Sequence, residues 1–335
     1  MRRRTRPAHA MNRPVKILAI DGGGIRGIIP ASLLAHIEGA TGRPIAELFD
    51  LIAGTSTGGI LALGLTIPKT KGAPLYPAQS FVEMYEREGP RIFSRSLWRR
   101  IVACNNLTEE KYCAAGIEAV LADYFGDSRL ADATTDVLVT SYEIERSFPF
   151  FFKSSNARRR PGYDFPARLV ARATSAAPTY FEPMKLRAET DTDCYTLIDG
   201  GVFANNPAAC ALVEARTTHP EASDFLVVSL GTGALNHSVS FGEAKTWGVV
   251  RWAVPLLNIV FDGVSSTVDY QLRQLLPDGD GECRRYYRFQ TTLDCHNHAL
   301  DNTGPANITA LQGLASGLIE KESGSIEQLC EKLLQ

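Results

Sequence analysis

The sequence predicts a protein of the α/β class with a mainly parallel central sheet. Segments rich in apolar and β-branched residues alternate with segments of helical character, the order expected when helices connect parallel strands. Several strand segments end in glycine turns: Gly22-Gly-Gly24 follows the strand at 15–20 closely, and Gly231-Thr-Gly233 follows the strand at 225–230. The second of these strands is nearly all apolar, which is typical of a parallel strand covered on both faces.

The elements are expected in a regular order along the chain. Strands are predicted at 15–20, in the apolar run that begins at Leu51, and at 136–142, 148–153, 195–198, 225–230 and 284–290. Helices are predicted at 28–40, in the apolar run after Gly59, and at 78–89, 108–124, 166–177, 208–217, from 246 to 276, and from 308 to 334. Thr108 is the expected N-cap of its helix, because two glutamates follow it in the first turn.

Composition limits the class of protein. The chain has 335 residues, a 44% hydrophobic and 21% charged composition, and a net charge of −2, which fits a soluble globular protein and argues against binding a nucleic acid polymer. The seven cysteines are scattered without a CxxC pair. That spacing predicts neither disulfides nor a metal site, and it is typical of a reducing cytosol.

The two ends of the chain are expected to differ in order. The N-terminus is basic and lacks the apolar segment of a secretory signal, so residues 1–13 are predicted to be a disordered tail, with Met11 as an alternative start. No repeat or linker divides the remainder, and 14–335 is therefore predicted to be a single domain that closes with C-terminal helices. The uncharged run from Leu51 to Pro68 has spanning length, but its glycines favour strand, turn and helix over a membrane span.

One short stretch carries the strongest chemical signal. Gly54-Thr-Ser56-Thr-Gly58 fits the nucleophile elbow, in which a strand turns sharply into a helix and presents a serine at the turn. Glycines are needed because a Cβ would collide with the crowded backbone, and the helix N-terminus favours an anion beside the serine. A plain connecting turn is the alternative, and the apolar runs on both sides favour the elbow.

A glycine-rich loop precedes the elbow. Asp21-Gly22-Gly23-Gly24-Ile-Arg26-Gly27 formally matches the dinucleotide fingerprint G-x-G-x-x-G, which would make this a nucleotide-binding module. The elbow, however, follows this loop within about thirty residues, which is too soon for a dinucleotide-binding unit. No clear second strand ends in an acidic residue at the place where that unit requires one. We therefore expect the backbone N–H groups of this loop to bind an oxyanion, with Arg26 as a fixed positive charge beside it.

A serine nucleophile needs a base, and Asp199 is the best-placed candidate. It ends a strand and is followed by Gly200-Gly201, so its side chain is expected to be exposed at the carboxyl edge of the sheet, where ligands meet. None of the six histidines lies at such a strand end, although His219 and His237 follow Asp199 in the chain order of a Ser–Asp–His triad. His296 and His298 lack a third metal ligand. A Ser56–Asp199 dyad without a metal or cofactor is predicted.

Two basic stretches leave alternatives open. Arg158-Arg159-Arg160 is either a solvated turn or a phosphate contact. The stretch 91–102 mixes basic and bulky apolar residues, and it either rests on an anionic membrane surface or packs on the core.

Together these motifs carry a resemblance. The loop at 21–27, the elbow at 54–58 and Asp199-Gly-Gly201, with 173–181 and 229–233, resemble the signatures of the patatin-like phospholipases in the same order. The resemblance implies a three-layer α/β/α fold and a calcium-independent lipid acyl hydrolase that contacts a phospholipid membrane peripherally. It also implies that Ser56 is the nucleophile, Asp199 the base, and Gly22, Gly23, Gly24 and Arg26 the oxyanion element.

The residues of these motifs are also similar to those of bacterial patatin-like effectors of anti-phage systems. That similarity implies activation by a cyclic oligonucleotide, with 158–160 as candidate phosphate contacts, and a gate made by a loop or by packing in a homo-oligomer. No motif in the sequence shows a nucleotide pocket.

Overall fold

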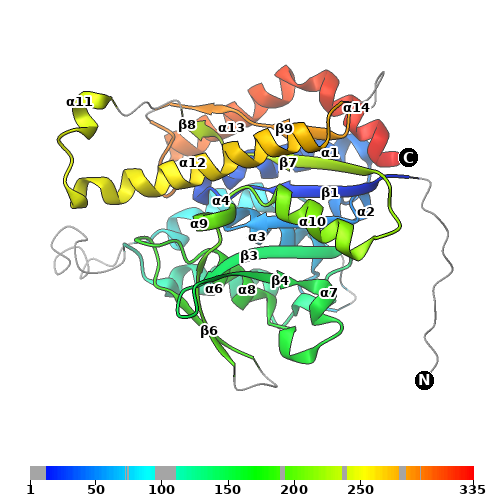
Figure 1. Cartoon of the computed structure of the whole chain (residues 1–335), viewed down its shortest axis with the longest axis horizontal. Helices are drawn as coiled ribbons and strands as arrows, with labels where there is room; N and C mark the ends of the chain where they lie inside the picture. The colour runs from blue at the N-terminus through cyan, green and yellow to red at the C-terminus, as the bar shows by residue number, and fades with distance from the viewer. Residues whose placement is uncertain are drawn as a thin grey trace.

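The fold is built around a mixed β-sheet (Figure 1). The computed structural model describes residues 13–71, 73, 75–94, 111–188, 193–235, 240–278, 284–294 and 296–335, without the side chains of 249, 250, 253 and 254. Among these residues the sheet has eight strands in the order β5-β6-β3-β2-β1-β7-β9, with β4 paired to β3. The bounds are β1 Val15–Ile20, β2 Leu51–Thr55, β3 Asp136–Glu143, β4 Phe148–Lys153, β5 Met184–Arg187, β6 Cys194–Asp199, β7 Phe225–Leu230 and β9 Tyr286–Phe289, and the short strands β8 Ala234–Leu235 and β10 Thr292–Leu293 form a separate pair.

The sheet has a parallel part and an antiparallel part. Strand β1 pairs in parallel with β2 and β7, and the parallel pairing extends to β3 on one side and β9 on the other. Strands β4 and β6 both pair antiparallel to β3, and β5 pairs antiparallel to β6. The prediction of an α/β fold with a mainly parallel sheet is confirmed, and the antiparallel edge is an addition that the sequence patterns did not indicate.

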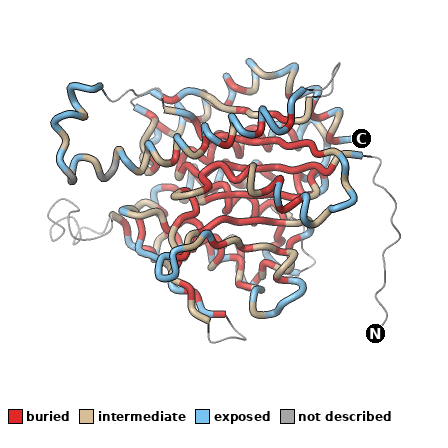
Figure 2. Tube along the Cα trace, in the orientation of Figure 1, coloured by how far each residue is buried: buried red, intermediate tan, exposed pale blue. Residues whose placement is uncertain are grey.

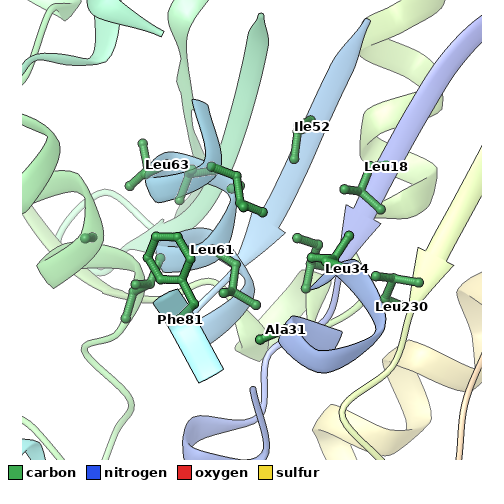
Figure 3. Packing of buried hydrophobic residues seen from close by; sticks show 14 of the residues in the cluster. Leu18, Ala31, Leu34, Ile52, Leu61, Leu63, Phe81 and Leu230 are labelled. Carbon is green, nitrogen blue, oxygen red and sulfur yellow. The ribbon is translucent and has the colours of Figure 1, made fainter. Parts of the chain in front are cut away.

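Helices cover both faces of the sheet, as the three-layer expectation required. Strand β1 shows how the sequence fills both sides: Leu18 and Ile20 belong to one core cluster, while Ile17 and Ala19 belong to the other. In the first cluster the sheet packs against α1 (Ile28–Thr41) and α3 (Thr57–Thr66), whose Leu34 and Leu61 lie on the same side of the sheet as Ile52 (Figure 3). In the second cluster it packs against α10 (Ala208–Thr218) and the later part of α12 (Val249–Leu275).

The helices begin and end close to the predicted positions. The bounds are α1 Ile28–Thr41, α2 Ile45–Leu48, α3 Thr57–Thr66, α4 Gln79–Ile92, α6 Ala114–Phe125, α7 Ser154–Ala157, α8 Ala167–Thr174, α9 Gly201–Ala204, α10 Ala208–Thr218, α11 Phe241–Ala244, α12 Val249–Leu275, α13 Pro305–Lys321 and α14 Ser323–Leu334. Helix α6 starts later than predicted, with Cys113 at its N-cap position, and Thr108 lies outside the described residues.

The chain ends connect to the fold differently. Of the predicted tail, 1–12 lie outside the described residues, whereas Arg13 forms an ion pair with Asp50 at 2.8 Å. At the other end, the buried Lys16 ammonium donates to the carbonyl of Leu333 in α14 at 2.7 Å. The helices that the structure describes include none with the length and apolar character needed to cross a bilayer.

Candidate active site

Ser56 occupies a sharp turn between β2 and α3. Its backbone has φ 54° and ψ −121°, a conformation that side chains with a Cβ rarely adopt. The turn is closed by two glycines. A Cβ on Gly54 would lie 2.1 Å from the carbonyl oxygen of Gly58, and a Cβ on Gly58 would lie 2.1 Å from that of Ile20. The stretch therefore has the geometry of a nucleophile elbow, and the positive φ falls on the serine itself.

Hydrogen bonds fix the backbone at the elbow. The Ser56 N–H donates to Thr174 Oγ1 at 2.8 Å, and that hydroxyl donates onward to the carbonyl of Thr140 at 2.6 Å. Thr174 ends α8, and Thr140 lies in β3 beside Thr55. The sequence patterns indicated no role for Thr174, although it lies within 173–181, one of the stretches that carry the family resemblance.

Asp199 reaches the same place from the opposite direction. In β3, Thr140 pairs with Thr55, the last residue of β2, and β3 then continues for three more residues. Strand β6 pairs antiparallel with these three residues, so that Asp199 lies beside Ser141. Asp199 therefore lies at the expected edge of the sheet, where β2 ends, although β6 reaches that edge running antiparallel to β3. The carboxylate is also buried, with 1% of the residue exposed, where an exposed side chain was expected.

Ser56 and Asp199 interact directly. Ser56 lies within hydrogen-bonding reach of the Asp199 carboxylate, and the Gly201 N–H donates to Oδ1 of Asp199 at 2.7 Å. Burial raises the pKa of Asp199 to about 7, and the two hydrogen bonds only partly oppose that rise. A carboxyl group with this pKa can accept a proton near neutral pH and release it again. Gly200 permits the turn, since a Cβ there would lie 2.2 Å from Thr140 Oγ1.

The glycine loop is oriented by bonds to its carbonyl groups. Thr232 Oγ1 donates to the carbonyl of Gly22 at 2.7 Å, and Arg26 donates to that of Gly23 through its backbone N–H and Nε, both at 3.2 Å. In a trans peptide the N–H of the next residue points the opposite way. The N–H groups of Gly23 and Gly24 therefore point away from Thr232 and Arg26. Both glycines line the cavity that contains Ser56.

Two members of the predicted oxyanion element have other roles. The Gly22 N–H donates to the carbonyl of Asn205 at 3.0 Å, so it is already used. The Arg26 guanidinium was expected beside the oxyanion, but it lies behind the loop in a separate polar cavity of about 410 Å³. Burial lowers its pKa to about 10, which still leaves it cationic at neutral pH. Arg26 therefore positions the loop.

The remaining loop glycines allow close packing. Gly24 has φ +57°, and a Cβ there would lie 2.2 Å from the carbonyl oxygen of Leu300. A Cβ on Gly27 would lie 2.3 Å from Thr57 Oγ1, so this glycine lets the loop approach the elbow.

A buried ion pair anchors the start of the loop. Arg288 on β9 donates to both carboxylate oxygens of Asp21, at 2.9 and 2.6 Å, and also to Ser229 Oγ at 2.8 Å. Both side chains are almost fully enclosed, with exposures of 6% and 2%. Sequence reasoning gave Arg288 no role, because its strand is about 270 residues away along the chain.

The cavity around Ser56 is mostly apolar. It measures about 50 Å³ and opens beside Asp199, Gly23 and Gly24. Its apolar wall consists of Ile60, Ile92, Phe93, Ile117, Tyr180, Phe181, Phe261 and Leu300. Such a wall suits a hydrocarbon chain, and a cavity this small holds only its first carbons. The side chains of the wall must move to admit a longer chain.

The other candidate residues lie elsewhere. His219 ends α10 and acts electrostatically on Asp50, which precedes β2, whereas Ser56 follows that strand. It therefore lies at the other end of the strand from the serine, and a triad through His219 is wrong. His237 is outside the described residues. Within the described part of the chain, no three His, Cys, Asp or Glu side chains are grouped as metal ligands would be.

The arginine cluster has mainly local partners. Arg158 pairs with Asp136 at 2.6 Å and donates to the carbonyl of Ala133, and Arg159 donates to the carbonyl of Ser155. Arg160 lies over the ring of Tyr163. This cluster follows α7, on the strand β4 side of the sheet, and shares no lining residue with the Ser56 cavity. Most of the stretch 91–102 lies outside the described residues.

Comparison with known proteins gives a consistent result. A family model described as "Patatin-like phospholipase" matches residues 18–212. "Patatin-like protein 4" of Arabidopsis thaliana is 31% identical, with 91% of this chain and 83% of that protein covered. "Patatin-like protein 1" of Oryza sativa subsp. indica is 31% identical, with 93% and 83% covered. "Probable inactive patatin-3-Kuras 1" of Solanum tuberosum is also 31% identical, with 92% and 87% covered.

Among solved structures, VipD from Legionella pneumophila matches with a TM-score of 0.40 and 11% identity, covering 92% of this chain and 67% of that one. One of the plant relatives is named as inactive, so activity in this chain has to be argued from its own side chains.

Proposed function

Because this chain belongs to the patatin-like phospholipase family, a family of serine lipid acyl hydrolases, we propose that it cleaves fatty acyl esters of glycerophospholipids with Ser56 and Asp199. The observation that carries the proposal is that Ser56 lies within reach of a buried carboxylate, and that both residues line one mostly apolar cavity. The apolar wall provides a place for the acyl chain, and the serine lies where its ester carbonyl would be.

The first half of the reaction forms an acyl-enzyme. Ser56 Oγ attacks the ester carbonyl carbon while its proton passes to Asp199. The negative charge that develops on the carbonyl oxygen is stabilised by the N–H groups of Gly23 and Gly24. The tetrahedral intermediate then collapses, the bond to the glycerol oxygen breaks, and Asp199 returns the proton to that oxygen. The lysophospholipid leaves.

The second half restores the serine. A water molecule gives a proton to Asp199 and attacks the acyl carbonyl. The bond to Ser56 Oγ breaks, the fatty acid leaves, and Ser56 recovers the proton from Asp199. A pKa of about 7 suits this repeated exchange, since a carboxylate with its usual pKa would be a weak base.

Hydrolysis of a fluorogenic phospholipid tests the assignment. Ser56→Ala is expected to lower kcat/KM by about a thousandfold or more without unfolding the protein. Ser32→Ala is a matched control, because that hydroxyl donates to the Ile28 carbonyl within α1. Wild-type activity in Ser56→Ala would refute the proposal. In the same assay His237→Ala is expected to retain activity, and a loss of several hundredfold without unfolding would favour a triad.

Activation by a cyclic oligonucleotide in anti-phage defence, through a gate in a loop or a homo-oligomer, is the more specific form of this proposal. It has only the sequence resemblance as support, and the relatives reported above are plant proteins. Phospholipase activity measured with and without a panel of cyclic oligonucleotides tests it. A large rise that disappears when 158–160 are changed to alanine would support it, and unchanged strong activity would refute it. Tight dinucleotide binding without esterase activity would instead favour the nucleotide-binding interpretation of the glycine loop.

A further inference from the structure

Helix α12 exposes large apolar side chains along one face of its first half. Trp252, Leu256 and Ile259 are four and three residues apart, so at 3.6 residues per turn they lie on the same face. Leu256 is 50% exposed and Ile259 is 47% exposed. Trp252 is half-buried against Trp247, with ring centroids 5.1 Å apart, and Phe241 in α11 is 82% exposed. We call these five residues the docking tip.

This face is not a continuation of the core. Phe261 follows Ile259 by two residues and so lies about 200° around the helix. Among the side chains that the structure describes, it is the first on the buried face of α12, which continues through Ser265, Val268 and Leu272. Farther along the helix the same face holds Ser266 and Tyr270, and Tyr270 exposes an aromatic ring with a polar hydroxyl. Among the described side chains, the exposed aliphatic ones on this face therefore lie toward its N-terminal end.

The docking tip lies at the same end of the molecule as the catalytic cavity. Figure 1 shows α11 and the start of α12 projecting past the edge at which β1 and β7 end, and Figure 2 shows this projection as exposed and intermediate residues. Ser56 follows β2, which runs parallel to β1, so the serine lies at that edge as well. Phe261 continues the same helix into the wall of the cavity. One helix thus connects the exposed apolar side chains with the site.

The charges on the projection favour an anionic partner. Lys245 and Arg251 are exposed there, close to the tryptophans in sequence. The carboxylate of Glu243 accepts bonds from the N–H and hydroxyl of Ser240 in a capping box, so its charge is partly used at the start of α11. Tryptophans beside basic residues on an amphipathic helix are typical of segments that lie in the interface of a bilayer.

We propose that the docking tip inserts into the boundary between headgroups and acyl chains of an anionic phospholipid bilayer. This inference rests on the proposed function, because a phospholipase must take its substrate from such a surface. Insertion would place the apolar catalytic cavity against the acyl chains, at the end of α12 that Phe261 reaches.

Vesicle binding tests the proposal without hydrolysis. In a Ser56→Ala background, binding to phosphatidylcholine vesicles containing phosphatidylglycerol is compared with the same protein carrying Leu256→Ser and Ile259→Ser. The double change is expected to weaken partitioning by about tenfold or more, since two large apolar contacts are lost. Tyr270→Ser is the matched control: it removes an exposed ring, 67% accessible, from the same face but outside the docking tip, and should bind as the parent does. Unchanged binding by the double variant would overturn the proposal.

Activity and association separate the alternatives. With Ser56 intact, the double variant is expected to keep wild-type hydrolysis of a short monomeric ester and to lose hydrolysis of vesicle lipid. Loss of both would indicate a damaged fold and overturn the proposal. A parent dimer that the double variant converts to monomer, without vesicle binding by either, would identify an interface between copies and also overturn it. If the parent with Ser56 hydrolysed neither substrate, the proposed function would fail, while vesicle binding would still decide the docking surface.

A second measurement does not depend on the variant. The chain has three tryptophans, so Trp98→Phe leaves Trp247 and Trp252 as reporters. Brominated lipids are expected to quench their fluorescence upon vesicle binding. Binding without quenching would contradict insertion at this site.

Discussion

The environment of Asp199 bears on both activity and stability. The carboxyl is buried, and its pKa is raised to about 7, mainly by desolvation. Asp199 in the unfolded chain titrates near pH 4. Between these two values the folded protein binds a proton that the unfolded chain does not, so this group lowers the stability of the fold as pH rises.

The pH dependence of catalysis follows from the same pKa. Only ionised Asp199 can accept the proton of Ser56, so kcat/KM for a monomeric ester is expected to rise with pH and level off above about pH 7. A pH–rate profile checks this expectation. A midpoint near pH 4 would mean that the base is an unperturbed carboxylate in some other place.

The stability consequence has a defined sign. Asp199→Asn removes a buried charge at high pH while keeping a similar side-chain volume. The stability of the variant relative to wild type should therefore increase from about pH 4 to about pH 7 and stay constant above pH 7. The expected gain at pH 8 is on the order of 1–4 kcal/mol, together with near-complete loss of turnover. Urea unfolding at several pH values measures it. A difference that shrinks as pH rises would contradict the assignment.

Thr232 is expected to act through the glycine loop. Its hydroxyl holds the carbonyl of Gly22 and thereby sets the direction of the Gly23 N–H. Thr232→Val should lower kcat by about tenfold with little change in KM, because a displaced donor is lost mainly in the transition state. Thr232→Ser keeps the hydroxyl and should retain activity. Steady-state kinetics of the two variants distinguish this positioning role from a packing role. If Thr232 served only for packing, Thr232→Val and Thr232→Ser would lose activity equally.

At the scale of elements, the elbow depends on two close backbone approaches. Gly58→Ala would place a methyl group 2.1 Å from the carbonyl oxygen of Ile20, so α3 would have to move away from β1. A loss of about 3 kcal/mol or more in unfolding free energy is expected, together with loss of turnover. Gly39→Ala in α1 is the control, since nothing lies within 4 Å and a helical alanine is favourable by about 1 kcal/mol. Similar unfolding energies for the two variants would contradict this account.

The elements and the site were predictable to different degrees. The core strands and the elbow were predicted because their signals are local: apolar runs, glycine spacing and a serine between them. The direction of β6 was not, because a short antiparallel strand has the same local pattern as a parallel one. The roles of Thr232 and Arg288 depend on β1, β7 and β9 lying side by side, which no single stretch of sequence encodes. Arg26 was assigned to the correct loop but the wrong side, since backbone direction decides which way its side chain points.

At the scale of the whole molecule, the last helix belongs to the main core. Ile326, Leu329 and Leu333 of α14 are buried in the cluster that also holds α1. Burying each such side chain contributes about 1.5–3 kcal/mol, and the sum approaches the total stability of an ordinary domain. A chain ending at Lys321 is therefore expected to be insoluble or unfolded. Removing only the exposed Gln335 should have no effect. Circular dichroism and solubility check both chains, and a folded, soluble product ending at Lys321 would argue against one domain.

The most direct test of the central assignment is to trap the serine. An acyl-mimicking fluorophosphonate is incubated with wild-type enzyme, Ser56→Ala and Asp199→Asn, and adducts are located by intact mass and peptide mapping. The proposed dyad predicts one adduct on Ser56 of the wild type, none on Ser56→Ala, and slow labelling of Asp199→Asn because the base is missing. An adduct on another residue in an enzyme that hydrolyses phospholipid, or full activity in Ser56→Ala, would contradict it.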